Sequence, residues 1–487
     1  MSGLATRAAL LTLSRLANYG LMLISPIILV RLLTVADFGR YREFLLYATL
    51  LQSFAVFSIN DSLLYCIPAQ PHSPWRTVRQ TAVLIACASL CVVIALAAAD
   101  GAMSGRLVGR YLTPLVAYTL LSVNLDFWEY LWLAQGRPGP VFAYTAGRLT
   151  ARILAALVTA ALTHDVGKII WALVALEGVR LAGAAVALAI LDRSRCEPQL
   201  AEPWREQLRF CLPSGLASLL AMLNRNLSNV VVARVLGAVP LAQYTIGRFG
   251  EPLVVAVRNS LSAVVLPEMV RRDRQPRDNP MALWRRATVI NTIVLFPVVV
   301  LVARYARPLT VAVFGPAYFQ AALMMQIYML VVVRECFDFA PALRALNRTR
   351  PLVESNIAAL ATCGVALLAL VPPAGVAGAM LALVLASLVD AGWLARRTMT
   401  LYGIGLREIL PWTSIGKTAL AAVAACALIV SPAWTDTFGV AGILLAAAGY
   451  LAAFASSLLI LRVPEALVLL EWVKRLLPAP PTTSRKV

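Results

Sequence analysis

Ionisable side chains lie inside long apolar stretches of this sequence, and their chemistry is the most informative feature of the chain. Each costs about 2.5–3.5 kcal/mol at the centre of a membrane helix on insertion scales, so such residues usually face water, a partner or a ligand. Guanidinium groups hold anions, above all phosphate, through two parallel hydrogen bonds. These residues are Arg15, Asp126, Glu129, Arg148, Arg152, Glu177, Arg180, Arg225, Arg248, Glu251, Arg258, Arg334, Glu335 and Asp338.

Several of these arginines lack a close acidic partner on their own helix, among them Arg15 and Arg225. Arg225 is flanked by Asn224 and Asn226 and lies about 13 Å deep, while Arg15 lies about 10 Å inside the opposite membrane face. We expect both to line a solvated cavity that takes an anionic cargo; pairing with Asp126 or Glu129 is the alternative. The predicted substrate-binding residues are Arg15, Asn18, Asn224, Arg225, Asn226, Arg248 and Arg258.

Four intramembrane carboxylates are candidates for binding a coupling proton or cation. They are Asp126, Glu129, Glu251 and Asp338. The alternative is structural, because Glu251 is three residues from Arg248, a spacing that permits an ion pair on one helix. The same holds for Glu177 and Arg180.

Composition shows what must position these residues. The chain has 487 residues, of which 60% are hydrophobic and 14% are charged, whereas soluble domains carry about 25% charged residues. The net charge of +19 resides mostly in short loops, as in the cytoplasmic loops of membrane proteins, so we expect no nucleic-acid partner. The eight cysteines show no metal-ligand spacing. We expect no metal, no cofactor and, since enzyme signatures are missing, no catalytic activity.

Apolar stretches long enough to cross a bilayer recur along the chain. We expect about fourteen membrane helices, with both termini cytoplasmic, because this orientation places about 26 basic residues inside and about 9 outside. The expected spans are 8–31, 41–64, 78–99, 110–134, 141–163, 168–191, 209–234, 240–267, 284–303, 318–344, 352–371, 375–395, 414–432 and 438–461.

Two short sequences occur twice, about two hundred residues apart. "RLLTVADFGRY" (31–41) is echoed by "RVLGAVPLAQY" (234–244), and "DFWEYLWLAQGRP" (126–138) by "DFAPALRALNRTRP" (338–351). The same order at similar offsets predicts a duplicated six-span unit in parallel topology, an arrangement that transporters use around a substrate path.

The predicted domains follow from this duplication. They are an N-terminal six-helix lobe (1–191), a cytoplasmic linker (192–208), a C-terminal six-helix lobe (209–397), two additional membrane helices (398–463), and an interfacial helix with a cytoplasmic tail (464–487).

With these repeats, the chain resembles the polysaccharide flippase branch of the multidrug/oligosaccharidyl-lipid/polysaccharide exporter superfamily. The resemblance implies two six-helix lobes in a V around a central cavity, and a polyprenyl-pyrophosphate-linked oligosaccharide as cargo at a bacterial inner membrane. It also implies a role in exopolysaccharide or lipopolysaccharide synthesis beside polymerases and glycosyltransferases. Trp128, Tyr130 and Trp132 would suit sugar rings.

Other functions stay open at this stage. One is a multidrug or cation antiporter of the same superfamily, which should favour cavity carboxylates over arginines. Another is a membrane glycosyltransferase or polymerase, and a lipid II flippase is a close variant. The sequence names neither the glycan nor the coupling ion nor the oligomeric state.

Overall fold

In the part of the chain that the computed structural model describes, helices are joined by turns and no strand occurs, which confirms the predicted all-α membrane fold. The described residues are 20, 23–64, 67, 74–102, 111–123, 126–135, 137–192, 204–273, 280–429 and 433–466. Arg15, Asn18 and most of the predicted interfacial helix and tail therefore lie outside them.

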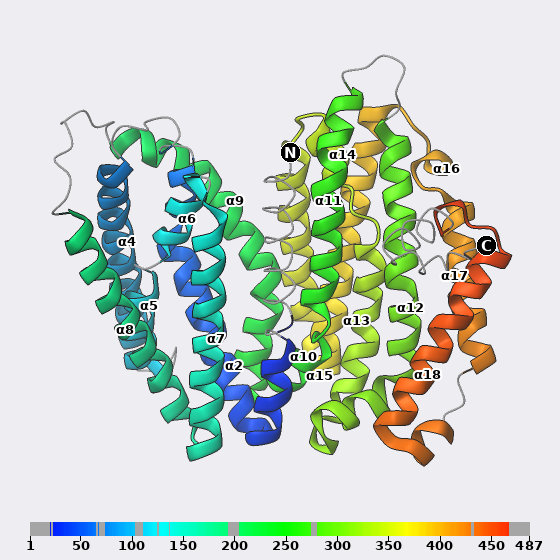
Figure 1. Ribbon diagram of the computed structural model, residues 1–487, viewed down its shortest axis with the longest axis horizontal. Helices are drawn as coiled ribbons and strands as arrows, with labels where there is room; N and C mark the ends of the chain where they lie inside the picture. Colours follow the sequence, from blue (N-terminus) through cyan, green and yellow to red (C-terminus); the bar gives the residue numbers. More distant parts are fainter. Residues whose placement is uncertain are drawn as a thin grey trace, which may run out of the picture. The chain divides into compact units, whose positions relative to one another are not determined.

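The chain forms two compact units, Met1–Thr245 and Ile246–Val487. The helices of the first unit, coloured blue to green in Figure 1, are α2 (Val35–Val56), α4 (Pro74–Ala102), α5 (Leu112–Val123), α6 (Phe127–Ala134), α7 (Pro138–Thr163), α8 (Val166–Asp192) and α9 (Trp204–Val231). A single turn, η1 (Asn60–Ser62), and a π-helical turn, η3 (Val232–Leu236), complete this unit, and α10 (Ala238–Gly247) spans the division.

The second unit has a core of its own, in which the rings of Trp284 and Phe339 stack with centroids 4.9 Å apart. Its elements are α11 (Glu251–Asp273), α12 (Pro280–Phe314), η4 (Pro316–Tyr318), α13 (Ala321–Glu335), α14 (Ala340–Ala345), α15 (Arg350–Tyr402), α16 (Leu406–Ile409), α17 (Trp412–Ile429) and α18 (Ala433–Ile460). Helix α18 begins five residues before the predicted span.

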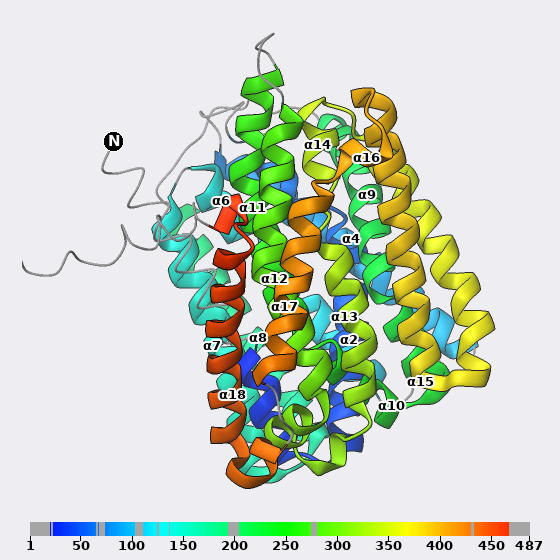
Figure 2. The ribbon, with the colours of Figure 1, turned by 90° about the vertical axis from the view of Figure 1, so that its right-hand side faces the viewer.

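Helix α15 is a hairpin rather than one rod. Its 53 residues would be about 80 Å long as a straight helix, far more than a bilayer spans. At Gly375 the backbone turns to φ 55° and ψ −127°, and Gly378 packs against the carbonyl of Leu370. Figure 2 shows the two segments side by side. The turn predicted between the spans 352–371 and 375–395 is therefore confirmed.

Four predicted spans are interrupted, which the sequence did not predict. In residues 41–64, α2 ends at Val56, and Phe57 and Ser58 have a left-handed backbone before the turn η1. Residues 240–267 form α10 and α11, residues 110–134 contain α5 and α6, and residues 318–344 contain α13 and α14. Pro252 and Pro341 lie in the first turns of α11 and α14, where proline has no N–H to continue the preceding helix.

Eight helices in the described part are long and apolar enough to cross a membrane, with α15 counted once. This supports a multi-pass membrane protein, while the count of fourteen stays a prediction. The division after Thr245 reflects compactness. It differs from the predicted lobes 1–191 and 209–397, which rest on sequence repetition and also stay a prediction.

Candidate functional site

In the first unit, one arginine lies between the two predicted coupling carboxylates of residues 110–134. Arg148 of α7 forms an ion pair with Asp126, which directly precedes α6. Its second terminal nitrogen is 3.2 Å from Oε1 of Glu129, a contact that has ion-pair distance but not hydrogen-bond geometry. Asp126 and Glu129 thus compensate the charge of Arg148 on a neighbouring helix, and a role for them in ion coupling stays a prediction.

A second pair extends this cluster into α8. Arg180 forms an ion pair with Glu177, a residue that is only 3% exposed. The Nη2 atom of Arg180 also lies 3.6 Å from Oδ1 of Asp126. The same nitrogen donates a hydrogen bond of 2.9 Å to the hydroxyl of Tyr144. Burying two charges together is tolerated when each has such partners. The cluster therefore ties α6, α7 and α8 together.

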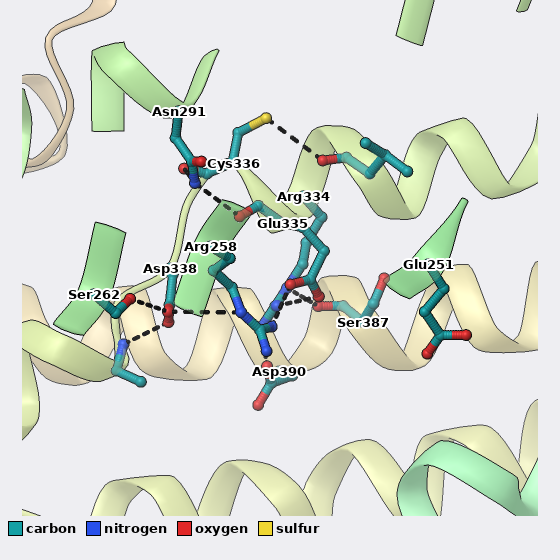
Figure 3. A network of polar contacts seen from close by, with 12 residues as sticks. Glu251, Arg258, Ser262, Asn291, Arg334, Glu335, Cys336, Asp338, Ser387 and Asp390 are labelled. Atoms are coloured by element: carbon teal, nitrogen blue, oxygen red, sulfur yellow. Dashed lines mark hydrogen bonds and ion pairs between the residues drawn. The ribbon is translucent and has the colours of Figure 1, made fainter. Parts of the chain in front are cut away.

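In the second unit, a network of two arginines and three carboxylates joins α11, α13 and α15 (Figure 3). Arg258 pairs with Glu335, and Arg334 lies 2.9 Å from the other carboxylate oxygen of Glu335. Arg334 also pairs with Asp390 and donates to the carbonyl oxygen of Ser387 at 3.1 Å. Arg258, a predicted cargo ligand, is thus neutralised within its own unit.

Asp338 is the loosely held member of this network. Its carboxylate accepts from the backbone N–H of Ala340 at 3.0 Å and from the hydroxyl of Ser262 at 3.3 Å, and the Nε of Arg258 is 4.0 Å away. The indole of Trp284 donates to its backbone carbonyl at 2.7 Å. The carboxylate therefore lacks the close guanidinium partner that Glu335 and Asp390 have.

A small pocket of about 20 Å³ lies beside Asp338. Asn291 contributes an amide whose Oδ1 has no hydrogen-bond partner, although the residue is only 3% exposed. This volume suffices for about one water molecule. The lining residues are Arg258, Leu261, Ser262, Val265, Trp284, Ala287, Thr288, Asn291, Cys336, Asp338 and Pro341.

The remaining predicted residues lie apart from this network. Arg248, in the turn between α10 and α11, forms an ion pair of 2.8 Å with Glu251, and Figure 3 shows Glu251 away from Asp338. On α9, Arg225 is exposed and Asn224 and Asn226 are half-buried, and Asn226 donates to the carbonyl of Met222. Arg225 and Asn224 each have a partner of their own.

In both copies of the Asp-Phe repeat, the aspartate lies just before a short helix. Asp126 directly precedes the short helix α6, and Asp338 precedes the short helix α14. Interrupted helices at corresponding positions of two repeats are the usual place for the substrate and ion sites of transporters. Sequence reasoning singled out both aspartates but missed Asp390, Ser262 and Asn291, because only packing brings them to this place.

The comparisons with known proteins identify the family. The model of the polysaccharide biosynthesis protein family matches residues 28–323. The chain belongs to this family. The family match confirms the predicted resemblance to the polysaccharide branch of the superfamily. No curated protein matches the sequence.

Solved structures show the fold shared by this polysaccharide biosynthesis protein. A structure of the lipid II flippase MurJ in an inward closed conformation superposes with a TM-score of 0.65 at 11% identity, covering 93% of this chain and 100% of that one. An inward-facing multidrug resistance MATE family transporter of the MOP superfamily gives 0.57 at 15% identity, covering 80% and 99%. A MATE structure in complex with MaD3S gives 0.51 at 15%, covering 82% and 97%.

The protein is therefore a multi-pass membrane protein of the polysaccharide biosynthesis family, with a fold that it shares with transporters. In the described part of the chain, no group of three or more His, Cys, Asp or Glu residues is arranged to hold a metal ion.

Proposed function

We propose that this protein flips a polyprenyl-pyrophosphate-linked oligosaccharide across the bacterial inner membrane by alternating access, for surface or exopolysaccharide synthesis. One observation carries the proposal: a member of the polysaccharide biosynthesis family has the fold of a lipid II flippase over 93% of its length. The cargo combines a diphosphate with sugars, and the chain carries Arg225 and Arg258 within the helices α9 and α11.

The ion pairs suggest how a pyrophosphate is taken up. Arg258 has Glu335 as its close partner, and Arg248 has Glu251. A guanidinium that exchanges a carboxylate for a phosphate keeps an anionic partner and can bind it through two parallel hydrogen bonds, so the exchange costs little electrostatic energy. The carboxylate released in this way is then free to take up a coupling proton or cation. Cargo entry and ion binding are thereby linked through the same arginine.

Transport of a labelled cargo tests the proposal. Purified protein is reconstituted in liposomes with a fluorescent polyprenyl-pyrophosphate oligosaccharide, and a membrane-impermeant glycosidase reports the fraction that reaches the outer leaflet. We expect exposure of the sugar well above that in empty liposomes. Exposure equal to that in empty liposomes would contradict the proposal. Formation of a longer glycan from the same lipid donor would instead indicate a glycosyltransferase or polymerase.

Arg225 gives the sharpest side-chain test of cargo binding. Arg225→Lys keeps the charge but loses the two-pronged geometry, so transport should fall partly. Arg225→Ala should abolish transport, and Arg225→Glu should do no better because it repels phosphate. Full transport by the Ala variant at normal protein level would remove Arg225 from the site. Arg209→Ala, an exposed change near the start of α9, serves as the control.

A cation antiporter is the second candidate, because the MATE transporter fold also matches, with a TM-score of 0.57. The same liposomes loaded with a cationic dye separate the two functions. Dye efflux driven by a proton or sodium gradient, without sugar exposure, would favour the antiporter.

A further inference from the structure

We propose that the first unit carries a sugar-binding pocket where α2 and α8 begin, a site that would take the terminal sugars of the cargo and thus rests on the proposed function. The pocket has a volume of about 280 Å³. All its lining residues belong to the first unit. They are Asp37, Arg40, Tyr111, Pro114, His164, Asp165, Val166, Gly167, Ile170 and Trp171.

The start of α2 holds one wall of the pocket. Thr34 caps the helix by accepting from the backbone N–H of Asp37 at 3.1 Å, and its hydroxyl donates to Oδ2 of Asp37 at 2.7 Å. The other oxygen, Oδ1, accepts from Nη1 of Arg40 at 3.0 Å. The side chain of Arg40 is 44% exposed, and its guanidinium group has further N–H donors that a ligand can use. The capping contacts therefore fix a carboxylate and a guanidinium in advance of any ligand.

The turn between α7 and α8 holds the opposite wall. His164 has a left-handed backbone with φ 49°, and its Nδ1 lies 3.0 Å from the carbonyl oxygen of Leu32. Because a carbonyl only accepts, Nδ1 carries a proton and donates it to Leu32, which leaves Nε2 facing away from this contact as the second polar atom of the ring. Asp165 accepts from the backbone N–H of Gly167 at 2.8 Å through Oδ1. Its second carboxylate oxygen is then available to a ligand hydroxyl.

The chemistry of these side chains suits a neutral sugar. Adjacent hydroxyls of a sugar donate to carboxylate and imidazole acceptors and accept from guanidinium donors. Trp171, which is 50% exposed, offers an aromatic face for the apolar side of a ring. Two carboxylates against one guanidinium disfavour a phosphate group. The volume lies just below the roughly 300 Å³ at which drug-sized pockets begin, which fits one or two sugar rings but not a lipid-linked oligosaccharide.

The orientation predicted from charge gives this pocket a role. The turn before α2 and the turn between α7 and α8 both lie on the external side in that orientation. A sugar bound there would hold the glycan after it has crossed, while the pyrophosphate is still within the membrane. The pocket would thus distinguish cargo by its terminal sugars.

Saturation-transfer NMR on the full-length protein in phospholipid nanodiscs tests the pocket directly. The probes are free glucose, galactose, mannose, N-acetylglucosamine and rhamnose. We expect saturable binding of at least one, with a Kd that rises tenfold or more in Trp171→Ala and in Asp165→Asn. Asn keeps an acceptor for the N–H of Gly167, so the Asp165 variant should fold normally. Trp204→Ala, at a residue 54% exposed that does not line the pocket, should bind like the original protein.

The outcomes separate this site from the proposed function. No saturable binding of any of the five sugars, or equal binding in all variants, would overturn the pocket and leave Trp171 as a membrane-interface residue. Flipping of the labelled lipid in that case would still support the function. Sugar binding that Trp171→Ala removes, in a protein that flips no lipid, would retain the pocket and refute the function.

Discussion

Gly39 lies directly against the backbone of Ala238, so that a Cβ on Gly39 would come within 2.0 Å of the carbonyl oxygen of Ala238. Gly39 belongs to the first copy of the repeated junction (31–41) and Ala238 to the second (234–244). Arg234 of the second copy also lies over the ring of Tyr47 of α2, 5.6 Å from its centroid. Two segments related by sequence repetition therefore pack on one another within the first unit.

Gly39→Ala should destabilise the protein by about 1–3 kcal/mol, because the backbone of Ala238 must move to admit the methyl group. The thermal unfolding midpoint of the detergent-solubilised protein measures this loss. Gly183→Ala is the matched control, since its Cβ would meet nothing within 4 Å and alanine favours a helix. Equal midpoints for Gly39→Ala and the original protein would mean that the junctions do not pack as described.

Glu177→Gln should cost about 3–5 kcal/mol, because it leaves the Arg180 guanidinium with one fewer anionic partner in a buried place. The exposed pair of Arg397 and Glu354 is the control, and Arg397→Met should cost less than about 1 kcal/mol. Denaturant or thermal unfolding of both variants checks the difference. Similar losses would show that burial does not strengthen the pair in the first unit.

Asp338→Asn and Asp390→Asn should fail in different ways. Asn at 338 keeps one acceptor oxygen for the N–H of Ala340, and its NH2 group can donate to the hydroxyl of Ser262. The protein should therefore fold, while transport falls at least tenfold if this carboxylate carries the coupling ion. Asn at 390 removes one of the two charged partners of Arg334, so folded protein should decrease first. Liposome transport and the amount of monodisperse protein are measured side by side. Normal transport by Asp338→Asn would exclude coupling at this residue.

Cysteine labelling of intact cells should confirm the orientation. In a variant without native cysteines, an impermeant maleimide should label Thr435→Cys at the start of α18 and should not label Ser194→Cys or Arg274→Cys. The charge distribution places the last two positions in the cytoplasm. Labelling of either one before the membrane is permeabilised would reverse the predicted topology.

Contacts between neighbours in the sequence could be predicted, whereas contacts across helices could not. The spacing of Glu177 and Arg180, and that of Arg248 and Glu251, predicts pairs that the structure contains. Arg334 meets Asp390 only because the second segment of α15 packs on α13, and no periodicity in the sequence encodes that partner.

For the fold as well, features set by neighbouring residues could be predicted, whereas some helix interruptions could not. Apolar length predicted the membrane helices, and Pro372, Pro373 and Gly375 lie at the turn predicted between the spans 352–371 and 375–395. The interruptions before α6 and α14 were missed because the flanking residues are apolar and read as one continuous span. The Asp-Phe pairs were the available signal, since an aspartate inside an apolar span can end one helix and begin another.

The network in the second unit has an electrical consequence. With all five groups ionised, its two guanidinium groups and three carboxylates leave one unit of negative charge within the membrane. Moving one charge through the full membrane field involves about 2.3 kcal/mol per 100 mV. A cycle that shifts this network along the field would therefore run at a rate that depends on voltage, and protonation or cation binding at Asp338 would make the same step electrically silent.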